Sequence, residues 1–251
     1  MRTDYTNPEN WPPIPLHVSL FFISLVFFLF LVIFSSLLVS SRNAGFSFQK
    51  RRLYISLTIL LVGGWLVATQ WLAVLGFFRH LYSYSSLLII LWALPIAFAT
   101  SLFISPTSQQ LLKGINGFWL TYIQSFRLFQ DFILYLLCKY HALPQEMSFP
   151  GYNLDFCVGA SAILVSYLCY TRSFWSKRVL IYWNLLGLLS LTWFSILSFS
   201  HTPYFNQVGG ELPNTIFFRL PFIWIPLFTI PFAFFVHLLS LRKTVEELKV
   251  S

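Results

Sequence analysis

Apolar residues fill seven long runs along the chain, separated by short polar segments. The runs cover residues 16–40, 53–78, 85–104, 117–140, 154–171, 179–200 and 215–241. A helix needs about 20 mostly apolar residues to cross the hydrocarbon core of a bilayer. The pattern therefore predicts an all-α, polytopic membrane bundle of about seven transmembrane helices, built as a single domain over residues 1–251.

The composition supports a lipid environment. Hydrophobic residues make up 57 % of the chain and aromatic residues 20 %, whereas charged residues make up only 10 %. Soluble domains carry about 25 % charged residues, so we expect the lipid bilayer to be the main partner. The net charge of +8 is spread over short loops, which indicates membrane topology and not a nucleic-acid partner.

The basic residues favour one orientation of the bundle. With the N-terminus outside, eleven of the sixteen lysines and arginines fall at the inner ends of the runs, and only three fall at the outer ends. Cytoplasmic loops are enriched in lysine and arginine. The sequence therefore predicts an outer N-terminus and a cytoplasmic C-terminus, with residues 242–251 as a frayed helix end.

Sequence motifs for cofactors and metals are missing. The three cysteines, Cys138, Cys157 and Cys169, form no CxxC pair, and no nucleotide-binding loop or HExxH motif occurs. No two histidines share a spacing typical of metal ligands. We expect neither a cofactor nor a metal site.

The fourth run contains the most polar residues. Arg127 and Asp131 are four residues apart, so they share one helical face and can form an ion pair. Ionisable groups within a span usually face the bundle interior. Two interpretations follow: a structural ion pair that orients helices, or a working site for a ligand, an ion or a proton.

Small residues mark the faces of the next two runs. In the fifth run the face includes Asp155, Gly159 and Ala162, and in the sixth it includes Asn184 and Gly187. Small residues at this spacing allow helices to approach closely. We therefore expect runs four, five and six to pack together around the buried pair.

Polar residues near the outer ends complete the candidate site. Asn153 is a good N-cap, and Asp155 falls in the first helical turn, where a negative charge complements the helix dipole. Arg219 can either extend to the headgroups or pair inward. The candidate ligand-binding or ion-pairing residues are Gln124, Arg127, Asp131, Glu146, Asn153, Asp155 and Arg219.

The seventh run is interrupted by three prolines, Pro221, Pro226 and Pro231. Each proline removes a backbone donor and bends a helix. A static kink and a broken helix that lines a cavity, as in many carriers, are both compatible with this pattern.

Several stretches of the C-terminal half resemble a group of uncharacterised bacterial integral membrane proteins with several spans. These stretches are Gln124-Ser125-Phe126-Arg127 with Asp131, Leu143-Pro144, Met147-x-Phe149-x-Gly151-x-Asn153-x-Asp155 with Gly159, Asn214-Thr215, Pro221-Phe222-x-Trp224-x-Pro226 with Pro231, and His237-x-Leu239-Ser240-Leu241. The resemblance implies a shared membrane fold and a bacterial inner (plasma) membrane location. It implies no activity.

A second resemblance concerns the start of the fifth run. Asp155-Phe156-Cys157-Val158-Gly159 resembles exosortase-type transpeptidases, which implies a nucleophilic cysteine at 157. The order of Cys157, His201 and Arg219 differs from the order in that family, in which the arginine precedes the histidine.

Three functions remain open. The first is a multi-pass protein that binds or transports a small ligand or ion at the buried polar site. The second is an accessory or scaffold subunit of a membrane complex with membrane-protein partners. The third is an intramembrane enzyme at the outer face, which is less favoured because the spacing shows no pair of nucleophile and base.

Overall fold

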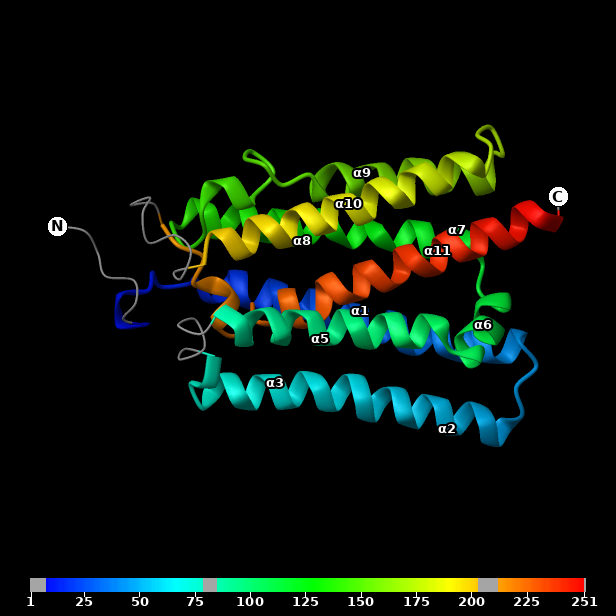
Figure 1. The fold of residues 1–251 in the computed structure, drawn as a ribbon, viewed down its shortest axis with the longest axis horizontal. Helices are drawn as coiled ribbons and strands as arrows, with labels where there is room; N and C mark the ends of the chain where they lie inside the picture. The colour runs from blue at the N-terminus through cyan, green and yellow to red at the C-terminus, as the bar shows by residue number, and fades with distance from the viewer. Residues whose placement is uncertain (1–7, 79–84, 203–211, 251) are drawn as a thin grey trace.

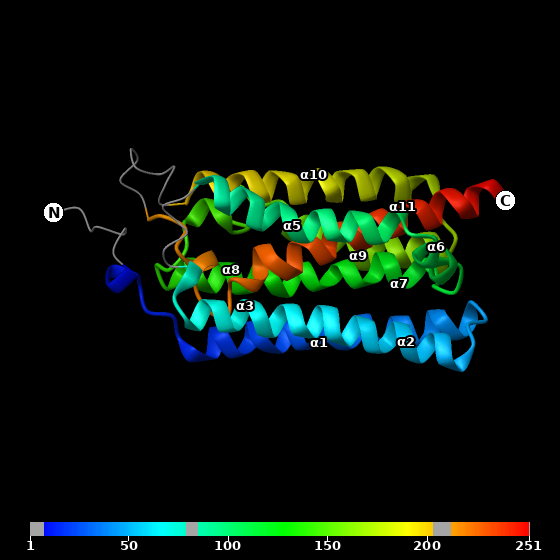
Figure 2. The same ribbon diagram turned by 60° about the horizontal axis from the view of Figure 1, so that its bottom comes forward.

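The computed structural model describes residues 8–78, 85–202 and 212–250. Within these residues all regular secondary structure is helical, and no strand occurs. The expectation of an all-α fold is therefore confirmed. Long helices run side by side along the longest axis of the molecule (Figures 1 and 2).

The helices follow one another in an order close to the predicted runs. The first is α1 (Leu16–Asn43), and the second rod consists of α2 (Phe48–Thr58), a π-helical turn (Ile59–Gly63) and α3 (Gly64–Val74). The remaining segments are α5 (Ser85–Ile104), α6 (Pro106–Lys113), α7 (Gly117–Tyr122), a 3-10 turn (Ile123–Ser125), α8 (Phe126–Lys139), α9 (Asp155–Ser166) with a π-helical end (Tyr167–Thr171), α10 (Arg178–Ser200), a π-helical turn (Ile225–Thr229) and α11 (Ile230–Val250).

Four helical rods are long and apolar enough to cross a membrane. In the described residues these are Leu16–Asn43, Phe48–Val74, Arg178–Ser200 and Ile225–Lys249, and Trp92–Ile104 and Asp155–Thr171 are shorter apolar helices. The rod formed by α7 and α8 belongs to neither group, because its polar residues lower its hydropathy. The class of the protein is thus an all-helical protein with several candidate membrane spans.

The second rod begins earlier than expected. Its helix starts at Phe48 and not at Leu53, because the Ser47 side chain accepts a hydrogen bond from the Lys50 backbone N–H at 3.3 Å. Serine is a favoured N-cap, and lysine and arginine are good helix formers. The basic segment therefore extends the helix beyond its apolar part.

The seventh run is not one continuous helix from residue 215, and a broken helix was one of the two possibilities that its prolines left open. A short 3-10 turn (Ile216–Phe218) comes first, Arg219 is extended, and continuous helix starts only in the π-helical turn at Ile225. The prolines explain this break, because each lacks the N–H that a helix needs.

The C-terminal tail is also better ordered than the sequence indicated. Helix α11 continues to Val250 instead of fraying after residue 241. Lys177 pairs with Glu247 at 2.7 Å, and the Lys243 ammonium donates to the Leu112 carbonyl at 3.2 Å. These contacts hold the last turns of α11 against α10 and α6.

Burial is distributed differently over the rods. Helix α11 is central and packs most extensively against α10 and α5, as Figures 1 and 2 show. By contrast, the rod of α2 and α3 exposes large apolar side chains such as Leu60 and Val67, each 69 % exposed. A contiguous apolar exterior suits contact with lipid.

An indole side chain replaces a backbone donor that proline removes. In an α-helix the Leu227 carbonyl would accept from residue 231, but Pro231 has no N–H. The Trp65 indole N–H donates to this carbonyl at 2.9 Å. Helix α3 therefore stabilises the proline-interrupted part of the rod that ends in α11.

We expect Trp65→Phe to lower the stability of the protein by about 1 kcal/mol, because a buried carbonyl then loses its donor. Thermal unfolding in one detergent would measure the effect. Trp71→Phe is the matched control, since Trp71 lies on the same helix and is 65 % exposed. Equal melting temperatures for both variants would contradict the role of Trp65.

Candidate functional site

Polar side chains from α8, α9, α10 and α11, from the 3-10 turn before α8 and from the loop before α9 meet in the interior of the bundle. We call this group the buried polar centre, and each member is at most 5 % exposed. Its members are Gln124, Arg127, Asp131, Asn153, Asp155, Asn184, Ser190 and His237. Buried polar groups in a membrane protein are costly and commonly mark functional sites.

Arg127 forms the main ion pair of this centre. Its Nη2 atom donates to Asp155 Oδ1 and, at 3.2 Å, to Ser190 Oγ. The Ser190 hydroxyl donates in turn to Asp155 Oδ1. Helices α8, α9 and α10 are thus joined by one arginine, one carboxylate and one hydroxyl.

The expected pairing of Arg127 with Asp131 is wrong in the described structure, which places the ion pair between Arg127 and Asp155. The reason is the close approach of α9 to α8. A Cβ atom added at Gly159 would lie 2.7 Å from the Leu128 backbone nitrogen. Asp155 is therefore held against Arg127, and the helix dipole alone does not account for it.

Asp131 has a neutral partner. The Asn153 side-chain amide donates to Asp131 Oδ1 at 2.5 Å and to the Met147 carbonyl at 3.3 Å. Asn153 Oδ1 accepts from the Asp155 backbone N–H at 3.0 Å, but the N-cap of α9 is Leu154, so Asn153 lies one residue before the expected capping position. Within the described residues, Oδ2 of Asp131 and Oδ2 of Asp155 have no hydrogen-bond partner.

His237 connects the ion pair to α11. Arginine can only donate, so His237 Nε2 must accept from Arg127 Nη1 at 3.1 Å. The proton then sits on Nδ1, which donates to Asn184 Oδ1 at 2.8 Å. Asn184 donates to the Leu180 carbonyl at 2.7 Å and to Ser240 Oγ at 3.0 Å. This network defines a neutral imidazole.

His237 and Ser190 belong to the centre but are not among the site residues predicted from the sequence. The proline-interrupted run hid the face of α11, so His237 was not assigned a partner. Two signals could have found it: an ionisable residue within a span, and Gly187 on the neighbouring helix. A Cβ atom added at Gly187 would overlap the His237 ring.

The other three candidates make separate contacts, and two of them, Arg219 and Glu146, lie outside the centre. Gln124 is fully buried, and its amide donates to the Ala233 carbonyl of α11 at 3.0 Å. Arg219 donates to the Pro12 carbonyl at 2.5 Å and lies over the Trp11 ring, so it holds the N-terminal segment. Glu146 is half-buried in a 3-10 turn (Gln145–Met147) outside the centre.

A cavity of about 490 Å³ lies close to the buried polar centre. Its lining includes Tyr135, Cys138, Glu146 and Ser148. Helical spacing places Asp131, Tyr135 and Cys138 on one face of α8. The cavity therefore begins about one helical turn from Asp131, at the end of the bundle that holds residues 139–153.

The charges of the centre do not balance. Arg127 is the one positive group of the buried polar centre, Asp131 and Asp155 supply two carboxylates, and His237 is neutral in the hydrogen-bond network. An uncompensated buried carboxylate is costly unless a proton or cation neutralises it. In the described residues no group of three or more potential metal ligands occurs.

Cys157 does not share the environment of the centre. It is exposed on α9, whereas Asp155, two residues earlier, is buried. Two residues correspond to about 200° around a helix, so the two side chains point in opposite directions. This geometry does not support a nucleophile at Cys157 acting with Asp155.

Fold and site together define a helical protein with several candidate membrane spans and a buried ionic centre. Residues 84–245 match a family model described as a domain of unknown function (DUF8737), and the chain belongs to this family. No curated protein and no solved structure matches the chain. The matched region contains the whole buried polar centre and leaves α1, α2 and α3 outside.

We expect Asp155→Asn to destabilise the protein by about 3–5 kcal/mol, because it leaves the Arg127 charge buried without its partner. The double variant Arg127→Met/Asp155→Leu removes both charges and should recover much of this loss. Thermal unfolding in detergent would compare the two. An Asp155→Asn variant that melts like the wild type would exclude a structural role for the pair.

Proposed function

We propose that the chain crosses the membrane seven times, with the N-terminus outside and the C-terminus in the cytoplasm. The support is the coincidence of helical rods with the predicted runs and the distribution of basic residues. The end of the bundle where α10 begins and α11 ends carries Lys50, Lys113, Arg172, Lys177, Lys243 and Lys249. Positive residues favour the cytoplasmic side.

This topology predicts opposite accessibility of the two ends. In a cysteine-free background, a single cysteine at Lys249 should react with an impermeant thiol reagent only after the membrane is opened. A single cysteine at His141 should react in intact cells. The reverse labelling pattern, or labelling of both positions from one side, would contradict the proposed orientation.

We propose further that the protein binds a small cation, in the simplest case a proton, at Asp131 and transports it. The observation that carries this proposal is a buried carboxylate whose hydrogen-bond partner is neutral, next to a complete ion pair. Asp131 is 1 % exposed, and its Oδ2 atom has no hydrogen-bond partner within the described residues. A bound cation would balance the charge of the centre.

Arg127 can couple the cation site to the helices. It lies one helical turn from Asp131 and pairs with Asp155 across the helix interface. Loss of the cation would leave two charged carboxylates competing for one guanidinium group. Movement of Arg127 toward Asp131 would loosen its bonds to α9, α10 and α11, which gives the centre two alternative pairings.

The proposed route from the outer side passes through the cavity that begins about one helical turn from Asp131, although Asp131 itself does not line that cavity. It is lined by polar groups from α8 and the following loop, including Glu146 and Ser148. Intramembrane carboxylates that face such polar spaces commonly serve ion and proton pathways.

An accessory role does not explain the unbalanced charge of the buried polar centre, so the geometry supports this role less than cation transport. An outer-face enzyme would require a nucleophile beside a base, and Cys157 faces away from Asp155.

A bacterial inner membrane is the proposed location, and it rests on the sequence resemblance alone.

Asp131→Asn should abolish cation transport and leave the fold intact. Asparagine preserves the shape of the side chain and can still accept from Asn153. Liposomes with the purified protein, an internal pH-sensitive dye and an imposed potassium diffusion potential would measure proton flux. We expect the rate to fall about tenfold or more, which corresponds to at least about 1.4 kcal/mol.

Glu246→Gln is the matched control, since it neutralises a carboxylate that is 41 % exposed and lies outside the centre and both cavities, and it should keep the wild-type rate. Melting temperatures would verify that both variants are folded. Sodium flux, followed with a sodium-sensitive dye, covers the other common cation. Wild-type rates no higher than those of protein-free liposomes in both assays would exclude the proposed transport.

A further inference from the structure

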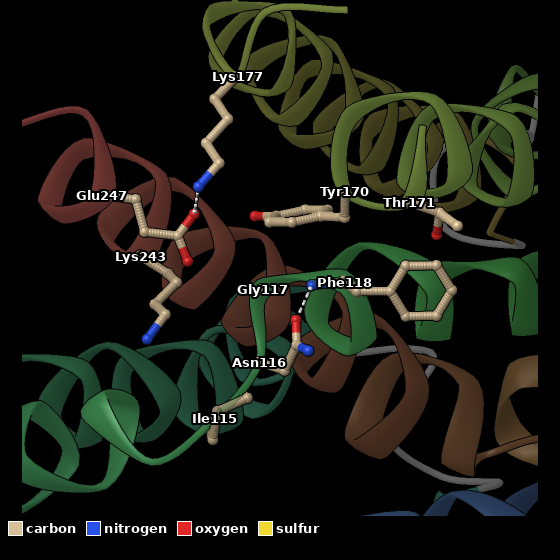
Figure 3. Close-up of a pocket in the computed structure, with 9 residues that line it drawn as sticks. All are labelled: Ile115, Asn116, Gly117, Phe118, Tyr170, Thr171, Lys177, Lys243 and Glu247. Carbon is tan, nitrogen blue, oxygen red and sulfur yellow. Dashed lines mark hydrogen bonds and ion pairs between the residues drawn. The ribbon is translucent and has the colours of Figure 1, made fainter. Parts of the chain in front are cut away.

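A second cavity lies at the opposite end of the bundle from Glu146. Its volume is about 400 Å³, and Figure 3 shows the segments around it: the connection between α6 and α7, the end of α9, the start of α10 and the last turns of α11. The side chains that line it include Asn116, Tyr170, Lys177, Lys243 and Glu247. None of them belongs to the buried polar centre.

Two ammonium groups line this cavity, with one carboxylate. Lys177 pairs with Glu247 at 2.7 Å, as the dashed line in Figure 3 marks, and lies 5.6 Å from the centre of the Tyr170 ring. Lys243 donates to the Leu112 carbonyl at 3.2 Å. An ammonium group has three donors, so each lysine retains donors for a ligand, and the lining has a net positive charge.

Neutral donors add to the lysines. The Tyr170 hydroxyl is buried, and within the described part of the chain no hydrogen bond of normal geometry satisfies it; its polar contact is the Thr244 side chain of α11. It lies directly against Gly117, where an added Cβ atom would overlap it, and Figure 3 shows it pointing toward the side of the cavity with Lys177 and Glu247. A buried hydroxyl without a hydrogen bond of normal geometry is costly, which indicates that a ligand or water completes this site.

Asn116 contributes a third type of donor. It is an exposed N-cap whose Oδ1 accepts from the Phe118 N–H at 2.9 Å. Because the oxygen is used, the amide group is left as a donor at the edge of the cavity. The cavity thus presents ammonium, hydroxyl and amide donors from four segments.

We propose that this cavity binds the phosphate group of an anionic ligand. Phosphate offers several acceptor oxygens, which suits a set of mixed donors better than the two oxygens of a carboxylate. The cavity lies at the end of the bundle that is rich in basic residues. Basic pockets between membrane helices on that side commonly bind anionic headgroups. The source is either a phospholipid headgroup or a soluble phosphate compound.

This site is independent of cation binding at Asp131, because no residue is shared. Its test is a binding measurement on the detergent-purified full-length protein. The probes are inorganic phosphate, short-chain phosphatidic acid and short-chain phosphatidylcholine, and the readout is the melting temperature during titration.

We expect phosphatidic acid to raise the melting temperature at lower concentrations than phosphatidylcholine. In Lys243→Gln and in Tyr170→Phe the half-saturating concentration should rise about tenfold, as expected for loss of a strong hydrogen bond to a charged group. The matched control is Lys249→Gln, which makes the same charge change on α11 at an exposed position outside the cavity. It should bind like the wild type.

The outcomes separate the alternatives. Stabilisation by phosphatidic acid but not by inorganic phosphate identifies a lipid headgroup, and stabilisation by both identifies a phosphate site open to soluble ligands. An equal loss of binding in Lys249→Gln would show non-specific charge attraction and overturn the proposal. No stabilisation of the wild type by any anionic probe would also overturn it. Tyr170→Phe removes one oxygen and preserves packing, so misfolding would not obscure the result.

Discussion

The structure depends on one buried ion pair, between Arg127 of α8 and Asp155 of α9. Through the same guanidinium group, Ser190 of α10 and His237 of α11 are joined to it. In lipid there is little hydrophobic driving force between helices, so close packing and interhelical hydrogen bonds must position them. A central arginine with donors on several sides suits this task. The glycines at 159 and 187 let the neighbouring helices come near enough to reach it.

The sequence predicted much of the fold because lipid solvation imposes a simple rule. A long apolar run favours a helix, and helices in the structure coincide closely with six of the seven apolar runs. The exception is the seventh run, which contains three prolines. The residue at which its helix starts depends on which donors replace the missing N–H groups. Trp65 is 162 residues away from Leu227, and no local pattern reveals such a partner.

The candidate site was only partly predictable for a related reason. Helical periodicity correctly placed Arg127, Asp131 and Gln124 on a buried face, and small residues indicated close packing of α9 and α10. Periodicity could not decide which carboxylate pairs with Arg127, since Asp131 on the same helix and Asp155 on the next both lie within reach. That choice depends on the position of α9 along α8, whereas the role of His237 depends on how closely α11 approaches α10.

The hydrogen bonds of α3 imply that the family region does not mark an autonomous folding unit. The matched region begins at residue 84, yet Trp65 donates to the Leu227 carbonyl, and Thr69 accepts from the Trp224 indole at 3.1 Å. A fragment cut at the family boundary would leave the Leu227 carbonyl and the Trp224 indole N–H without these partners. Homologues that lack the N-terminal helices would therefore need another subunit, or different residues at these positions, to provide the missing partners.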